Sequence, residues 1–149
     1  MLKPSVYEKT MVISLLRSLL LGLLLFSSAC SLVPTAEPPV SDNSAVRALV
    51  EQAVAEREAG KLAAAAAALE RALRIEPRNP RVWQELARVR LVEGDAAQAE
   101  QLAVRAATWA GDDRSVRAAS WRLIAEARAT RGDRAGADEA LARARQYEH

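Results

Sequence analysis

A pattern of small residues occurs three times along this chain of 149 residues and limits its fold more than any other feature. Gly60, Gly94 and Gly132 are each followed by one alanine five residues later and by another twelve residues later. The first two units are 34 residues apart and the last two are 38 apart, which places a four-residue insertion near residues 112–116. Small residues repeated at this interval predict an all-α solenoid of stacked helix pairs. Solenoids of this kind usually bind other molecules rather than catalyse reactions.

Hydrophobic periodicity and turn residues predict six helices. The three glycines suit the left-handed position that ends the first helix of each pair. Asp95 and Asp133 suit the N-caps of the helices that follow, and Asn79-Pro80 places a proline at a first helical turn, where its missing N–H costs little. Connections this short join the helices as antiparallel hairpins. The expected helices are Ser44–Ala59, Leu62–Glu76, Pro80–Glu93, Ala96–Ala110, Ser115–Arg131 and Ala135–Tyr147.

Residues at fixed places in the three units resemble the tetratricopeptide repeat (TPR). Unit two carries Trp83, Leu86, Ala87, Gly94, Asp95, Ala99 and Ala106, and unit three carries Trp121, Ile124, Ala125, Gly132, Asp133, Ala137, Leu141 and Ala144. Unit one matches at Leu49, Ala53, Ala65, Leu69, Ala72, Leu73 and Pro77. Unit two departs from the pattern at its end, where Gly111 stands in place of the proline. The resemblance implies a TPR domain over residues 44–149, with repeats at about 46–79, 80–113 and 118–149.

The first 29 residues predict a secretory signal peptide. An apolar run follows Arg17 and ends at Phe26, and small residues continue it to Ala29. The apolar and small residues together number 12, whereas a membrane-spanning helix needs about 20, so a permanent span is disfavoured. Met11 is an alternative to Met1 as the translation start, because the residues after it already supply the positive flank.

The end of this leader resembles the signal of bacterial lipoproteins, in which a small residue precedes a diacylated cysteine that becomes residue one. Ala29 and Cys30 match that signal. Ordinary cleavage at the same bond is the alternative, but it leaves a lone free thiol in an oxidising compartment. In the lipoprotein family an aspartate after the cysteine commonly retains the protein in the inner membrane, so Ser31 implies the outer membrane. Three prolines make residues 30–43 a disordered tether that reaches at most about 40 Å.

Composition excludes several classes of function. Cys30 is the one cysteine, so no internal disulfide forms, and the one histidine, His149, supports neither a catalytic triad nor a histidine metal site. The chain has 21 basic and 19 acidic side chains, and removing the leader leaves equal numbers, so it has no positive surplus for nucleic acid. No motif activates a nucleophile or binds phosphate. We predict a non-enzymatic protein without catalytic residues, metal or cofactor, apart from a covalent lipid on Cys30.

In repeat proteins of this family, the first helix of each pair lines a groove that binds a partner. Aligning the three units places charged and polar residues there. The predicted groove residues are Arg47, Arg57, Arg81, Gln84, Arg88, Arg122 and Glu126, joined by Val50, Val54, Glu58, Leu91, Val92 and Thr130. Five arginines against two glutamates predict a basic groove that suits carboxylates or planar groups. The alternative is that these arginines are solvated or pair with neighbouring acids, as most surface charges do.

Aromatic residues are few, and those of the repeat domain have predicted roles. Trp83 and Trp121 stand at core positions and are expected to fill gaps between helix pairs. Trp109 ends the fourth helix beside an irregular segment, where it either packs on that helix or lies exposed in a contact site. Tyr147 is a second candidate for an edge contact, with a partner or with a second copy of the chain.

Small repeat lipoproteins of this layout resemble outer-membrane regulators of cell-wall synthesis, of which one group activates bifunctional penicillin-binding proteins. The resemblance implies a protein-binding scaffold that faces the periplasm and is concentrated at the membrane by its lipid. The alternative is a pilotin-like lipoprotein that assembles a pilus or secretion complex. A chaperone-like holdase is disfavoured because it needs a more apolar groove. The chain also lacks the family's carboxylate clamp, because Val50 and Val54 replace its Lys and Asn.

Overall fold

The computed structural model describes residues 38–148, which form six α-helices and no strand. The helices are α2 (Ser44–Glu58), α3 (Leu62–Ile75), α4 (Pro80–Val92), α5 (Ala96–Trp109), α6 (Arg114–Thr130) and α7 (Arg134–Gln146). Each helix begins and ends within one residue of its predicted bounds. The predicted signal peptide, Cys30, both candidate start methionines, tether residues 30–37 and His149 lie outside the described residues.

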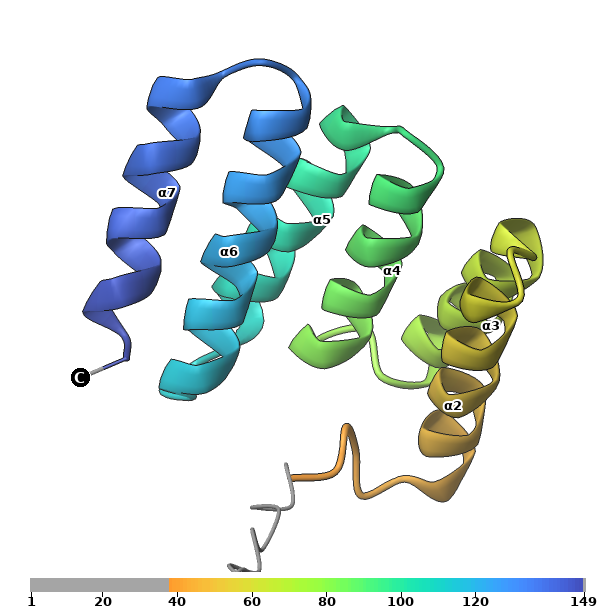
Figure 1. The fold of residues 1–149 in the computed structure, drawn as a ribbon. Helices are drawn as coiled ribbons and strands as arrows, with labels where there is room; N and C mark the ends of the chain where they lie inside the picture. Colours follow the sequence, from red (N-terminus) through yellow and green to blue (C-terminus); the bar gives the residue numbers. More distant parts are fainter. Residues whose placement is uncertain (1–37, 149) are drawn as a thin grey trace, which may run out of the picture. The chain divides into compact units, whose positions relative to one another are not determined.

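Consecutive helices form three antiparallel pairs, α2–α3, α4–α5 and α6–α7, which stack side by side (Figure 1). Helices α3 and α5 each also pack against the first helix of the next pair. Helices α2, α4 and α6 neighbour one another and make one face, which we call the first-helix face. Helices α3, α5 and α7 make the opposite face. The predicted all-α solenoid of three repeats is therefore confirmed.

Different loops form the two edges of this stack (Figure 1). The tight turns within the pairs, at residues 59–61, 93–95 and 131–133, lie at one edge, which we call the turn edge. The loops between pairs, at residues 76–79 and 110–113, lie at the other edge with residues 38–43, and we call it the tether edge. Because helix α4 has 13 residues and α6 has 17, the two edges are about 20–25 Å apart.

Glycines and aspartates make the turn edge, as predicted. Gly60, Gly94 and Gly132 have φ angles of 75°, 85° and 81°, a left-handed region in which a Cβ atom is strained. The side chains of Asp95 and Asp133 accept hydrogen bonds from backbone amides three residues further on. These bonds satisfy N–H groups that have no partner within their own helix.

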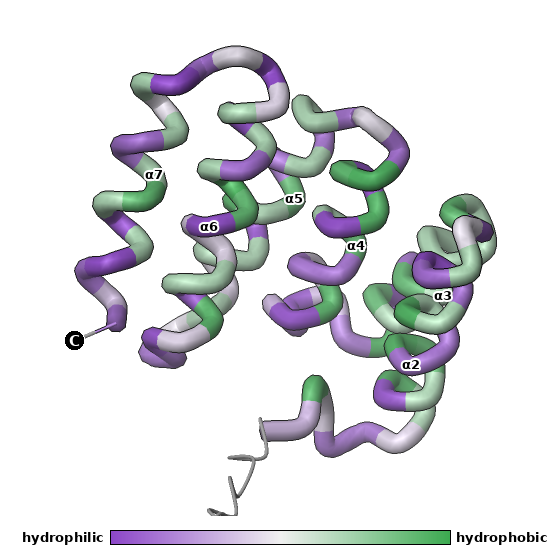
Figure 2. Tube along the Cα trace, in the orientation of Figure 1, coloured by the Kyte–Doolittle hydropathy of each residue, from purple (hydrophilic) through white to green (hydrophobic). Residues whose placement is uncertain are grey.

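Alanine dominates the core: it supplies more than half of the buried hydrophobic residues. Small side chains let the backbones of neighbouring helices approach closely, and Leu69 and Ile124 are among the few large side chains that are fully buried. Figure 2 shows hydrophobic and hydrophilic positions alternating around the helices, as expected where one side is buried. Trp83 and Trp121 are half-buried and pack against this core, as predicted.

The end of the predicted tether differs from expectation. Val40 packs against the core, and its carbonyl accepts a hydrogen bond from Asn79. Ser41 donates a hydrogen bond to Glu76. The prediction of a tether without packed contacts is therefore wrong for residues 40–43. Their partners lie 35 and 39 residues away in the chain, a separation over which local sequence composition carries no information.

Candidate functional site

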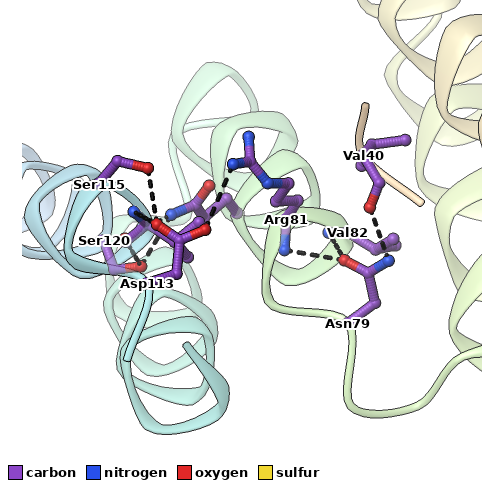
Figure 3. Close-up of polar contacts among 9 residues, drawn as sticks. Val40, Asn79, Arg81, Val82, Asp113, Ser115 and Ser120 are labelled. Atoms are coloured by element: carbon purple, nitrogen blue, oxygen red, sulfur yellow. Dashed lines mark hydrogen bonds and ion pairs between the residues drawn. The ribbon is translucent and has the colours of Figure 1, made fainter. Parts of the chain in front are cut away.

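Two of the predicted groove arginines are held by the tether edge. Arg47 Nη1 donates hydrogen bonds to the carbonyl oxygens of Ser41 and Asp42, at 3.0 and 2.8 Å. Arg81 pairs with Asp113, with 3.4 Å between Nη2 and Oδ2, and its side chain is 15% exposed. Both guanidinium groups therefore have structural partners within the domain, and Figure 3 shows the pair of Arg81 and Asp113.

The other three groove arginines are Arg57, Arg88 and Arg122. They lie in the middle of their helices or nearer the turn edge. Arg88 pairs with Glu85 one turn earlier, and Arg122 pairs with Glu148. Arg57 is half-buried on α2. The ion pairs of Arg88 and Arg122 agree with the alternative prediction, in which the groove arginines pair with neighbouring acids. The side chains of Arg88 and Arg122 remain 36% and 54% exposed, so they are the groove arginines best placed to reach a partner.

Gln84 lies inside the junction between α4 and α6 rather than at the surface. It is 5% exposed, and its Nε2 donates to the carbonyl of Val116 at 2.8 Å and to Ser120 Oγ at 2.9 Å. Ser120 is fully buried and donates to the same Val116 carbonyl (Figure 3). These bonds join the second and third repeats. Gln84 therefore has a structural role at this junction.

The predicted groove residues that are most open to a partner on α4 and α6 make up what we call the accessible part of the first-helix face. Val92 is 58% exposed, the largest exposure among the big hydrophobic residues of the described range 38–148, and Glu126 is exposed on α6. With Arg88 and Arg122 they form a surface that carries both charge signs and one apolar side chain. Of the other predicted groove residues, Glu58 and Thr130 are exposed, Val54 and Leu91 are half-buried, and Val50 is buried.

Asp113 caps α6 in addition to pairing with Arg81 (Figure 3). Its carboxylate accepts hydrogen bonds from the Val116 amide at 3.0 Å and from the Ser115 hydroxyl at 2.7 Å. Burial acts to raise the pKa of Asp113, but these hydrogen bonds and the charge of Arg81 outweigh it, so the pKa lies below its ordinary value. Because the folded-state pKa is lowered, the carboxylate stabilises the fold at neutral pH and loses this effect as the pH falls through that pKa.

Each aromatic side chain of residues 38–148 has an arginine over its ring, an arrangement that sequence analysis did not predict. The Cζ of Arg105 lies 5.2 Å from the ring centroid of Trp83, and that of Arg143 lies 4.8 Å from Trp121. The two pairs occupy positions related by the 38-residue repeat. Both join the two helices of one pair, so stacking of the guanidinium on the ring supports the hairpin.

Trp109 and Tyr147, the two candidates for an edge contact, lie at the ends of α5 and α7. Trp109 is 41% exposed. The Cζ of Arg78 lies 4.9 Å from the centroid of the Trp109 ring. Tyr147 is half-buried, with Arg117 at 5.5 Å. It lines two open hollows of about 320 and 490 Å³. Of the two, Trp109 therefore presents the more accessible ring.

Two further findings bear on chemistry in this part of the chain. Among residues 38–148, no group of three or more histidine, cysteine, aspartate or glutamate side chains is placed to hold a metal ion. No helix of the same residues combines the length and the hydrophobicity needed to cross a bilayer. The described residues provide exposed helix surfaces on which several charges are paired.

Known proteins share this fold. Among solved structures, the N-terminal domain of stress-induced protein-1 (STI-1) from C. elegans matches with a TM-score of 0.63 at 16% identity, covering 70% of this chain and 87% of that one. That likeness concerns the fold alone. No curated protein sequence matches the chain.

A second solved structure is much more similar in sequence. The globular C-terminal domain of P. aeruginosa LpoP matches with 46% identity and a TM-score of 0.69, covering 70% of this chain and 99% of that one. The family model of the tetratricopeptide repeat matches residues 56–120, which span most of the first repeat, the whole second repeat and the start of the third. Together with the three stacked helix pairs, these matches show that the chain belongs to the tetratricopeptide repeat proteins.

Proposed function

We propose that this chain is an outer-membrane lipoprotein whose TPR domain faces the periplasm, binds a bifunctional penicillin-binding protein and activates its synthesis of peptidoglycan. The observation that carries the proposal is the 46% identity across 99% of the globular domain of P. aeruginosa LpoP. A second support is the resemblance of the sequence to small repeat lipoproteins that activate such enzymes. The lipoprotein signal that ends at Ala29-Cys30 supports the attachment to the membrane.

In this proposal the chain acts by binding and supplies no catalytic residue. The lipid on Cys30 confines the domain to one surface, which raises its effective concentration for a partner that is also bound to the envelope. The proposed contact surface is the accessible part of the first-helix face, with Arg88, Arg122, Glu126 and Val92. Its mixture of charges favours a partner surface of mixed charge over a purely acidic tail.

The direct test is affinity capture from cross-linked envelopes with the full lipidated chain, read by mass spectrometry. The proposal expects enrichment of a bifunctional penicillin-binding protein. It also expects that adding the purified mature chain to that purified enzyme increases glycan polymerisation and crosslinking. Enrichment of secretin or pilus components, together with no effect on the enzyme, would replace the proposal with the assembly role.

Reversing two charges on the first-helix face tests the contact surface. We expect Arg88→Glu with Arg122→Glu to weaken binding to the captured enzyme by at least about tenfold, or 1.4 kcal/mol, because both guanidinium groups are accessible. The matched control is Arg71→Glu with Arg145→Glu, the same charge change at exposed positions on the second helices α3 and α7. Binding measured by surface plasmon resonance should be unchanged in the control. Equal losses in the two variants would move the contact away from this face.

Replacing the proposed lipidated residue tests the anchor. We expect Cys30→Ser to move the mature chain from the membrane fraction to the soluble periplasmic fraction, because two acyl chains provide the stable attachment. Ser31→Asp is the matched variant: it should keep the lipid and shift the chain from outer to inner membranes in a density gradient. Membrane attachment that survives Cys30→Ser would contradict the lipid anchor.

A further inference from the structure

Arginines and exposed apolar side chains gather where α3 and α5 end, on the face of the second helices. Both helix ends lie at the tether edge (Figure 1). Ile75, the last residue of α3, is 46% exposed, and Trp109, the last residue of α5, is 41% exposed. Exposed arginines accompany them on α3, in the loop after it and on α5. We call this group the basic patch: Arg71, Arg74, Ile75, Arg78, Arg105 and Trp109.

Ring contacts connect the members of the basic patch. The Cζ of Arg78 lies 4.9 Å from the centroid of the Trp109 ring. Arg105 precedes Trp109 by four residues on α5, so the two share a side of that helix, and its Cζ lies 5.2 Å from the centroid of Trp83 on α4. Arg71 occupies the same repeat position as Arg105, 34 residues earlier, and both are exposed. The basic patch is therefore continuous from α3 to α5.

The positive charge of the basic patch is not neutralised by the domain. Within residues 38–148, none of its four arginines forms an ion pair with a carboxylate. Glu70, on the same helix as two of them, pairs instead with Arg90. Glu76 and Asp112 lie in the loops at the same edge and offset at most two of the four charges. The basic patch therefore keeps a positive surplus on a mature chain whose basic and acidic residues are equal in number.

The chemistry of these side chains suits phospholipid headgroups. Arg78 and Arg105 lie over indole rings, and a stacked guanidinium keeps the N–H groups along its edge for phosphate oxygens. Tryptophan favours the interface between water and lipid, and an arginine beside it can bury its stem while its charge stays at the level of the headgroups. Ile75 adds apolar surface next to Trp109. The basic patch thus offers phosphate donors and interfacial side chains together.

We propose that the basic patch binds the headgroups of anionic phospholipids, with Trp109 and Ile75 at the depth of the interface. The inference rests on the membrane attachment in the proposed function, because that attachment keeps the domain at a phospholipid surface at high effective concentration. Each arginine close to an anionic surface strengthens binding about fivefold, so the patch adds a second membrane contact to the lipid anchor. It lies on the opposite face from Arg88 and Arg122, which remain available to the enzyme.

Binding to vesicles without the anchor tests this inference. The mature chain carrying Cys30→Ser is purified without lipid and sedimented with phosphatidylcholine vesicles that contain or lack phosphatidylglycerol, over a range of lipid concentrations. We expect binding to require phosphatidylglycerol and to weaken at high salt, because salt screens exposed charges. Lipids with brominated acyl chains should quench the fluorescence of Trp109, the most exposed of the three tryptophans. Trp109→Phe should remove most of that quenching.

A charge variant and a matched control complete the experiment. Arg74→Gln with Arg78→Gln should weaken vesicle binding at least about tenfold and leave binding to the enzyme in detergent unchanged. The control, Arg134→Gln with Arg145→Gln, removes the same charge from exposed positions on α7 that have no ion pair within the described residues, and should change vesicle binding by less than about twofold.

Three results would overturn the inference. They are a lack of vesicle binding by the unaltered mature chain, binding that does not depend on phosphatidylglycerol, and equal losses in the charge variant and its control. Loss of enzyme binding in Arg74→Gln with Arg78→Gln, with vesicle binding unchanged, would assign the basic patch to a protein contact instead. Because the vesicle assay contains neither the enzyme nor the anchor, its outcome is separate from that of the affinity capture.

Discussion

Replacing Leu69 by alanine is expected to lower the free energy of unfolding by about 2–5 kcal/mol. Leu69 is fully buried in α3, which packs against both α2 and α4. Ala65, Ala66 and Ala72, its buried neighbours on the same helix, are too small to fill the space that the leucine would leave. The loss therefore combines the transfer of the side chain with the cost of a cavity that cannot collapse.

Unfolding in urea, followed by circular dichroism at 222 nm, measures this loss. The chain offers a matched control in Leu141→Ala, because Leu141 occupies the same repeat position in α7 but is 39% exposed. We expect Leu141→Ala to lower the free energy of unfolding by only about 1 kcal/mol. Leu141 buries less apolar surface on folding than Leu69 does, so its removal costs less. If the two variants lowered the free energy of unfolding by similar amounts, Leu69 would not be packed in the core as described.

Enlarging Ala106 is expected to destabilise the domain by about 1–3 kcal/mol. Ala106 is fully buried on α5, a helix that packs between α4 and α6. Leucine at this place would add three carbon atoms to a fully buried position between closely packed helices, which would push the neighbouring helices apart. A hydrophobic substitution that normally favours a core would in this case oppose folding.

The same unfolding measurement, applied to Ala97→Leu, provides the control. Ala97 lies on the same helix but is exposed, so the added side chain meets solvent and should change the stability by less than about 0.5 kcal/mol. Tolerance of Ala106→Leu without loss would mean that the helices are less closely packed than the structure indicates. Crystal structures of the variants would then show where the extra volume is accommodated.

The helices could be predicted from the sequence because their limits depend on local chemistry. Gly94 and Asp95 illustrate this, since a left-handed glycine and a capping aspartate act on residues within one turn. The core could be predicted for a similar reason. Alanines recur at the repeat interval, and only a close approach of helices explains why large residues are missing there.

The surface could not be predicted in the same way, because its contacts join distant residues. Gln84 occupies a groove position in the repeat pattern, yet Ser120, 36 residues later, provides a buried partner for it. Arg81 pairs with Asp113, which lies 32 residues later in the chain. The prolines before residue 40 predict a tether but give no sign that Ser41 bonds to Glu76. Side-chain pairing across repeats depends on the offset between helices, which only the folded structure provides.

The packing of α7 has a consequence for how the domain opens. Among the described helices, α7 contacts only α6, whereas α4 packs against four of them, α2, α3, α5 and α6. In a linear array of this kind, stability is the sum of each unit's own stability and its contacts with its neighbours. The backbone amides of α7 should therefore exchange with deuterium through local fraying, while those of α4 exchange only when the whole array unfolds. A protease would accordingly attack the folded domain first at its C-terminal helix.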